Sequence, residues 1–158
     1  RPERIMCDLM NIDKLNSIQV KHYGSGAEQQ EKAEVLNENS GDLRGKKVLL
    51  VDDVNDSGQS LSAAYNRLKD AKSLKTAVLH EKENTEFKAD FVGKKYHDWK
   101  WLIYAWAVTE DVLEFLNKAG QLEATIESAQ SFLANQYELK LDKKLLKRIL
   151  NYKENYFK

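Results

Sequence analysis

Residues 48–60 constrain the fold of this chain more than any other segment. They begin with four consecutive apolar residues, 48–51, a pattern typical of a parallel strand that is buried on both faces. Asp52 and Asp53 follow, and residues 56–60 are a predicted tight turn into a helix. A buried strand that leads through a short turn into a helix predicts the first half of a βαβ unit.

The segments that follow alternate between helix and strand. Residues 60–72 carry apolar side chains on one helical stripe, and residues 76–80 are the next predicted strand. Residues 101–106 are predicted to form one more strand, and residues 110–118 a helix that Gly120 terminates. This alternation predicts an α/β fold, with a doubly wound, mostly parallel sheet and helices on its faces.

The N-terminal part begins with a predicted helix that starts at Pro2, a residue suited to a first helical turn. Residues 17–23 alternate like a strand and end at the flexible residues 24–26, and a short strand is predicted at 34–37. Residues 24–31 are therefore a candidate mobile loop that closes over a ligand.

The C-terminal part is helical in pattern, with predicted helices at about residues 122–136 and 143–152. Asp142 is a candidate N-cap of the second helix. We therefore expect an α/β domain at residues 1–119 and a helical C-terminal appendage at residues 120–158.

The turn at residues 56–60 has the chemistry of an anion site. Backbone N–H groups at the start of a helix favour a phosphate, Gly58 allows close approach, and the Ser57 and Ser60 hydroxyls add hydrogen bonds. The Asp52 and Asp53 carboxylates accept hydrogen bonds, which suits the two adjacent hydroxyls of a ribose. Together these residues predict a site for ribose 5-phosphate, whereas the alternative is a solvated acidic turn after a strand.

Residues 48–60 resemble the phosphoribosyl pyrophosphate signature of the type I phosphoribosyltransferases. In that signature a hydrophobic strand leads to two acidic residues and then to a Ser/Thr-Gly-x-Ser/Thr phosphate loop. Asn55 is one departure, because the family more often carries a small or apolar residue there; we expect it to change little.

Other segments are similar to the purine branch of that family. Residues 21–24 resemble the strand end before its mobile catalytic loop, and residues 78–82 the strand whose terminal lysine meets the exocyclic oxygen of a 6-oxopurine. Residues 89–93 and 101–106 resemble the segment that ends in an aromatic clamp, with Ala105 in place of a proline.

The resemblance implies a role for each matching residue. Asp52 and Asp53 would hold the ribose hydroxyls, directly or through Mg²⁺, and Asp56 would accept the proton of the purine. The other implied site residues are Lys21 and Tyr23 in catalysis, Ser57, Gly58, Gln59 and Ser60 around the 5-phosphate, Lys82, Trp101 and Leu102 at the base, and Glu110 at a second Mg²⁺. Lys82 as a surface lysine and Trp101 as a core residue are the structural alternatives.

The activity implied is transfer of 5-phosphoribosyl from phosphoribosyl pyrophosphate to a 6-oxopurine, which yields a nucleoside 5′-monophosphate and pyrophosphate for purine salvage. A non-catalytic module that senses phosphoribosyl pyrophosphate is the alternative. A transferase for a pyrimidine or orotate is a third possibility, which the aromatic segment at residues 101–106 disfavours. The resemblance also implies a homodimer or higher homo-oligomer.

The composition limits the classes of binding partner that we expect. The 25 Lys and Arg residues balance the 25 Asp and Glu residues, so bulk charge does not favour nucleic acid or an anionic membrane. There is no run of about 20 apolar residues, and the single cysteine, Cys7, agrees with a reduced cytoplasmic setting. His22, His80 and His97 lack the spacing of a metal site or triad.

The resemblance also raises an expectation about the start of the chain. In the family, a strand and an Arg-Gly-Gly type pyrophosphate loop come before a helix that resembles residues 1–9. That strand and loop have no counterpart before Arg1 in this sequence, so we expect the chain by itself to be impaired in catalysis.

Overall fold

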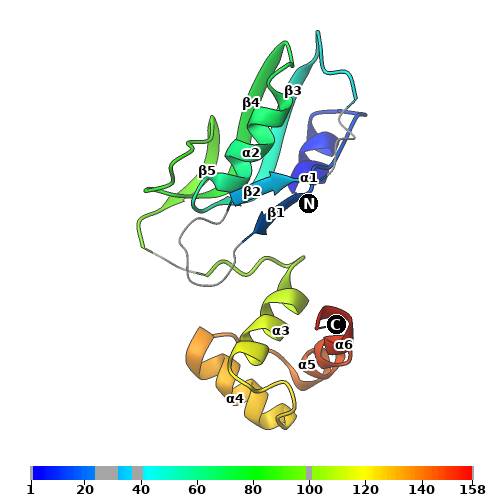
Figure 1. The fold of residues 1–158 in the computed structure, drawn as a ribbon. Helices are drawn as coiled ribbons and strands as arrows, with labels where there is room; N and C mark the ends of the chain where they lie inside the picture. Colours follow the sequence, from blue (N-terminus) through cyan, green and yellow to red (C-terminus); the bar gives the residue numbers. More distant parts are fainter. Residues whose placement is uncertain (1, 24–31, 37–40, 99–100, 158) are drawn as a thin grey trace. The chain divides into compact units, whose positions relative to one another are not determined.

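The computed structural model describes residues 2–23, 32–36, 41–98 and 101–157, and it divides into two compact units. The first unit is Arg1–Lys100 and the second is Trp101–Lys158 (Figure 1). The predicted boundary, after residue 119, differs because the helix that follows residue 107 packs its apolar face into the second unit. Among the described residues, none of the helices is long and apolar enough to cross a bilayer.

A three-stranded parallel sheet forms the centre of the first unit. Its strand order is β3 (Lys47–Asn55), β4 (Ser73–Lys82) and β5 (Phe91–Tyr96). Helix α2 (Gln59–Leu68) connects β3 to β4, and it buries Leu61, Ala64 and Leu68. The predicted βαβ unit is therefore confirmed, and so is the α/β class of the fold.

Three boundaries in this unit differ from the prediction. Strand β3 continues through Asp52 and Asp53 to Asn55, whereas the end of the apolar run predicted that it stops before the acidic pair. Helix α2 ends at Leu68, because the residues beyond it enter the turn before β4. Strand β5 was not predicted, since Gly93 and two lysines break its apolar pattern.

The N-terminal elements of this unit are a helix and a hairpin. Helix α1 (Pro2–Leu9) contacts β3, and β1 (Val20–Tyr23) pairs antiparallel with β2 (Lys32–Val35). Both hairpin strands contact α2. The strand predicted at 17–23 thus begins at Val20, and the one predicted at 34–37 lies two residues earlier.

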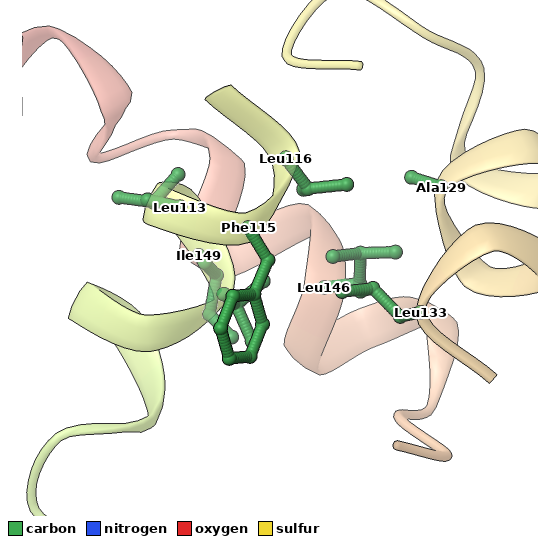
Figure 2. Close-up of a cluster of buried hydrophobic side chains, with 8 residues drawn as sticks. Leu113, Phe115, Leu116, Ala129, Leu133, Leu146 and Ile149 are labelled. Atoms are coloured by element: carbon green, nitrogen blue, oxygen red, sulfur yellow. The ribbon is translucent and has the colours of Figure 1, made fainter. Parts of the chain in front are cut away.

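The second unit is a cluster of helices around one apolar core. Its helices are α3 (Val108–Lys118), α4 (Ile126–Tyr137), α5 (Lys143–Leu150) and the short α6 (Lys153–Tyr156). Figure 2 shows side chains from α3, α4 and α5 meeting in this core, which consists of Val112, Leu113, Phe115, Leu116, Ala129, Leu133, Leu146 and Ile149.

The ends of these helices follow the sequence signals. The Asp142 Oδ1 accepts a hydrogen bond of 2.8 Å from the Leu145 N–H, which confirms Asp142 as the N-cap of α5. Gly120 has a φ of +65° directly after α3, a conformation that glycine adopts without strain, so it ends that helix as predicted.

The prediction of a strand at residues 101–106 is wrong. Residues 101–104 have no regular structure, and residues 105–107 form a turn into α3. The Trp101 indole packs edge-on against Phe115 of α3, with ring centroids 5.6 Å apart. The rings of Tyr104 and Trp106 stack at 5.0 Å. Packing among aromatic side chains, and not strand pairing, therefore fixes this segment.

Candidate ribose-phosphate site

The candidate site lies at the carboxyl end of β3, where the chain turns into α2. A pocket of about 320 Å³ opens there, lined by Val54, Asn55, Asp56, Ser57, Gly58, Ser60 and Leu61. The first N–H groups of any helix lack partners within the helix, and its N-terminus carries a partial positive charge. The pocket therefore combines hydroxyls and backbone donors suited to a phosphate, and it is bordered by the Asp56 carboxylate.

Gly58 gives the turn its shape. It has a φ of +93°, a region that L side chains rarely adopt. A Cβ on this residue would lie 2.6 Å from the Phe87 backbone nitrogen and 2.8 Å from the Thr85 Oγ1. The turn at residues 56–60, which the resemblance identifies as a phosphate loop, is thus packed directly against residues 85–87. A second contact, from the Glu86 N–H to the Ser57 carbonyl at 3.1 Å, joins the two segments.

The acidic pair lies within the last part of β3, and not beyond the end of the strand as the apolar run predicted. Both residues are half-buried, and the Asp52 Oδ1 accepts a 2.9 Å hydrogen bond from the Asp53 N–H. Burial raises the pKa of Asp52 to about 6, and the negative charges of Asp53 and Glu3 act in the same direction. A cation or hydroxyl donors at this carboxylate would favour its ionised form.

The fit of Mg²⁺ to this site depends on the donor set. In the part of the chain that the structure describes, no group of three or more His, Cys, Asp or Glu side chains is arranged to hold a metal. Magnesium is usually bound by one or two carboxylates together with substrate oxygens and water. A carboxylate of Asp52 or Asp53 would suit this mode, in which a bound sugar phosphate and water would supply the remaining ligands.

Lys82 and Asp56 form an ion pair across the ends of β4 and β3. The Lys82 side chain is 20% exposed and the Asp56 side chain 58% exposed. The structure therefore brings together two residues that are 26 positions apart and that the family resemblance assigns to the base. The contact of Lys82 to a base stays a prediction.

Behind this ion pair lies a buried polar cluster that sequence reasoning missed. Asn55 and Glu81 precede Asp56 and Lys82, and they are 2% and 1% exposed. The Asn55 amide donates to the Glu81 carboxylate at 2.9 Å. The sequence does show a polar residue directly before each of two predicted site residues. That these two polar residues pair with each other follows only from the register of β3 and β4.

Two predicted catalytic residues lie on the hairpin. Lys21 is in β1, with an exposed side chain, and Tyr23 is the last residue of that strand. The side chain of Tyr23 and the candidate closing loop at 24–31 lie outside the described residues. The roles of Lys21 and Tyr23 stay predictions.

Three predicted site residues lie in the second unit. The Trp101 Nε1 donates to the Asp111 Oδ1 at 3.0 Å, and its ring contacts Phe115. Leu102 is half-buried, and Glu110 is exposed in the first turn of α3. Their contacts to base or metal stay predictions.

A parallel βαβ sheet with an acidic pair and a glycine turn at the carboxyl end of one strand defines a class of α/β proteins that bind sugar phosphates or nucleotides. The particular family follows from the sequence comparison: residues 11–111 match the phosphoribosyl transferase domain, and the chain belongs to that family. The fold and the resemblance predicted from residues 48–60 are confirmed.

The similar proteins agree with this assignment. A crystal structure of purine phosphoribosyltransferase from Pyrococcus horikoshii Ot3 is 31% identical, with a TM-score of 0.58 over 66% of this chain and 68% of that one. The hypoxanthine-guanine phosphoribosyltransferase of Aquifex aeolicus is 36% identical over 86 residues, 51% of this chain and 48% of that protein. This chain thus spans about half the length of that relative.

A further structure shows the fold alone. The xanthine-guanine-hypoxanthine phosphoribosyltransferase of Helicobacter pylori has a TM-score of 0.54 at 23% identity, over 72% of this chain and 73% of that one.

Proposed function

We propose that this chain carries the ribose-phosphate and base-reading residues of a purine phosphoribosyltransferase. The reaction is transfer of 5-phosphoribosyl from phosphoribosyl pyrophosphate to a 6-oxopurine, which yields a nucleoside 5′-monophosphate and pyrophosphate. The observation that carries this proposal is the shared position of the pocket at residues 56–60, the acidic pair and the Asp56–Lys82 ion pair, at the carboxyl ends of two adjacent parallel strands. The names of the similar proteins support the purine as the acceptor.

Some residues of the chain bind the sugar phosphate, and others act in proton transfer. Ser57, Ser60 and the backbone at Gly58 hold the 5-phosphate, and this fixes the sugar in place. Asp52 and Asp53 hold the two ribose hydroxyls. When Mg²⁺ is bound beside them, it neutralises charge on the leaving pyrophosphate.

Asp56 and Lys82 act on the base. The Lys82 ammonium donates a hydrogen bond to the oxygen of the 6-oxopurine, while the Asp56 carboxylate accepts the proton from the ring nitrogen. Since the two side chains already form an ion pair, each is oriented by the other before the base arrives. The same pair favours a base that presents an acceptor and a donor side by side.

The other predicted residues complete this proposal. Lys21 and Tyr23 would act from the hairpin as the loop at 24–31 closes, Trp101 and Leu102 would contact the base, and Glu110 would bind a second Mg²⁺. We also propose a homodimer or higher homo-oligomer in the cytoplasm, as the resemblance implies.

Titration calorimetry tests the binding half of the proposal. Phosphoribosyl pyrophosphate with Mg²⁺ and inosine 5′-monophosphate should bind, whereas uridine 5′-monophosphate should bind at least about tenfold more weakly. Turnover is then assayed with hypoxanthine, guanine, xanthine, adenine and orotate. Turnover on a purine base would contradict the sensing module, and equal binding of the two monophosphates would contradict purine recognition.

A further inference from the structure

The buried cluster behind the ion pair holds two adjacent strand ends together. Asn55 and Glu81 are register partners on β3 and β4, so their side chains leave the sheet side by side. The Asn55 Nδ2 donates to the Glu81 Oε2 at 2.9 Å. Each is followed directly by a residue of the proposed site, Asp56 or Lys82. The register of β3 and β4 places the two site residues side by side, and the bond between the two buried side chains holds them in that position.

The same cluster anchors the segment that supports the phosphate loop. The Asn55 Nδ2 also donates to the Phe87 carbonyl at 2.6 Å, and the Thr85 hydroxyl donates to the Asn55 Oδ1 at 3.3 Å. The Glu81 Oε2 accepts from the Ala89 N–H at 2.8 Å. Residues 85–89 are thus held in place by hydrogen bonds to Asn55 and Glu81.

Residues 85–87 in turn lie against the phosphate loop. The Phe87 nitrogen and the Thr85 hydroxyl fill the space beside Gly58, and the Glu86 N–H donates to the Ser57 carbonyl. A continuous set of contacts therefore leads from Asn55 through residues 85–87 to the turn that would bind the 5-phosphate. The hydrogen bonds of this network fall on the Glu81 Oε2, whereas the Glu81 Oε1 has only the Lys95 ammonium, at 3.8 Å, among the described residues. Buried polar networks rigidify the structure through the hydrogen bonds that they make.

We propose that Asn55 and Glu81 are positioning residues, which preorganise the phosphate loop and Lys82 as one unit. The inference rests on the proposed function in one respect only, the identity of the ligand. It also gives a role to Asn55, which the sequence indicated only as a departure from the family pattern with little effect. Preorganisation acts on affinity, because a loop that is already ordered loses less conformational entropy on binding.

The test compares Asn55→Val with Thr76→Val as a matched control. Thr76 is also buried on β4, and its hydroxyl and N–H contact Asp90 at 3.0 and 2.8 Å, so its loss also breaks a buried polar network. Neither Thr76 nor Asp90 lines the pocket. Both substitutions should lower stability, but only Asn55→Val should weaken binding of ribose 5-phosphate, by on the order of tenfold.

Amide hydrogen exchange gives a readout that needs no ligand. The Glu86 and Ala89 N–H groups, which donate to the Ser57 carbonyl and to the Glu81 carboxylate, should exchange faster in Asn55→Val and at an unchanged rate in Thr76→Val. Glu81→Gln keeps an oxygen acceptor for the Asn55 amide and the Ala89 N–H, so it should retain slow exchange and most of the affinity. If Asn55→Val fails to fold, Asn55→Val with Glu81→Leu also removes the buried carboxylate that the single variant leaves without the Asn55 amide. The double variant should therefore be more stable than Asn55→Val, while residues 85–89 stay without their anchor.

The outcomes separate the two proposals. Unchanged exchange and affinity in a folded Asn55 variant would overturn the positioning role and leave the proposed function intact. Wild-type protein that does not bind ribose 5-phosphate would contradict the proposed function, and the exchange of the Glu86 and Ala89 N–H groups would still decide the positioning role. Equal loss of affinity in Thr76→Val would show that general destabilisation is the cause, and would overturn the inference.

Discussion

Asp52→Asn is expected to stabilise the protein at neutral pH, although it removes a residue of the proposed site. The reason is that the folded state holds this carboxylate in a poorly hydrated position beside Asp53 and near Glu3. Burial raises the pKa of Asp52 from 3.8 to about 6. Ionisation of Asp52 therefore costs more in the folded than in the unfolded chain, and asparagine avoids that cost.

The magnitude follows from linkage between proton binding and folding. A rise of the pKa from 3.8 to about 6 corresponds to about 3 kcal/mol of lost stability once both states are ionised. The folded state binds the proton more tightly, so this loss develops as the pH rises from about 4 through 6 and is complete above that. Since Asp52 is only half-buried, we expect about 2 kcal/mol at pH 8.

Urea denaturation of the wild type and Asp52→Asn at pH 8 and pH 4 measures this effect. The variant should be more stable by about 2 kcal/mol at pH 8, and the gain should fall to less than about a quarter of that at pH 4. Asp90→Asn is a control in which the free energy of unfolding should change in the opposite direction. Hydrogen bonds from Lys75 and Thr76 hold the pKa of Asp90 below its usual value, so this variant should lose stability at pH 8. No gain for Asp52→Asn, or a gain independent of pH, would refute the reasoning.

Three other substitutions test the site. Asp56→Asn should lower turnover by about 10²–10⁴-fold and phosphoribosyl pyrophosphate affinity far less, as steady-state kinetics would show; equal losses would make Asp56 a loop residue only. Lys82→Met should weaken 6-oxopurine binding by about 1.5–3 kcal/mol and leave adenine binding unchanged in competition assays; equal losses for both bases would argue against base reading. Gly58→Ala should cost more than about 1 kcal/mol in urea denaturation, because its φ and the Phe87 nitrogen exclude a Cβ; a neutral result would contradict the turn geometry.

The features predicted well from the sequence are those that depend on local pattern. The apolar run at 48–51, the turn at 56–60 and the N-cap at Asp142 carry their information within a few residues, and the structure has β3, the start of α2 and the start of α5 there. The strand predicted at residues 101–106 was wrong because its structure depends on contacts with residues distant in the sequence. Its alternating aromatic residues fit a strand, but Trp101 packs against α3, which local pattern does not reveal.

The ion pair of Asp56 and Lys82 could be predicted from the sequence only in part. Each residue was singled out from its own segment, whereas their contact depends on the parallel register of β3 and β4. Carboxyl ends of adjacent parallel strands meet at one edge of a sheet, so the sequence indicated the neighbourhood of the site. It did not indicate that the two side chains pair.

The buried pair of Asn55 and Glu81 shows why a departure from a family pattern is best judged together with its partner. A buried carboxylate that lacks hydrogen-bond donors costs several kcal/mol, so Glu81 depends on the amide of Asn55 and the N–H of Ala89. Conversely, an asparagine inside an otherwise apolar strand end needs acceptors, and Glu81 is one of them beside the Phe87 carbonyl. Each residue loses one of its buried hydrogen-bond partners when the other is replaced. Relatives with an apolar residue at the position of Asn55 should therefore lack a carboxylate at the position of Glu81, and a relative with only one of the two would need another partner for it.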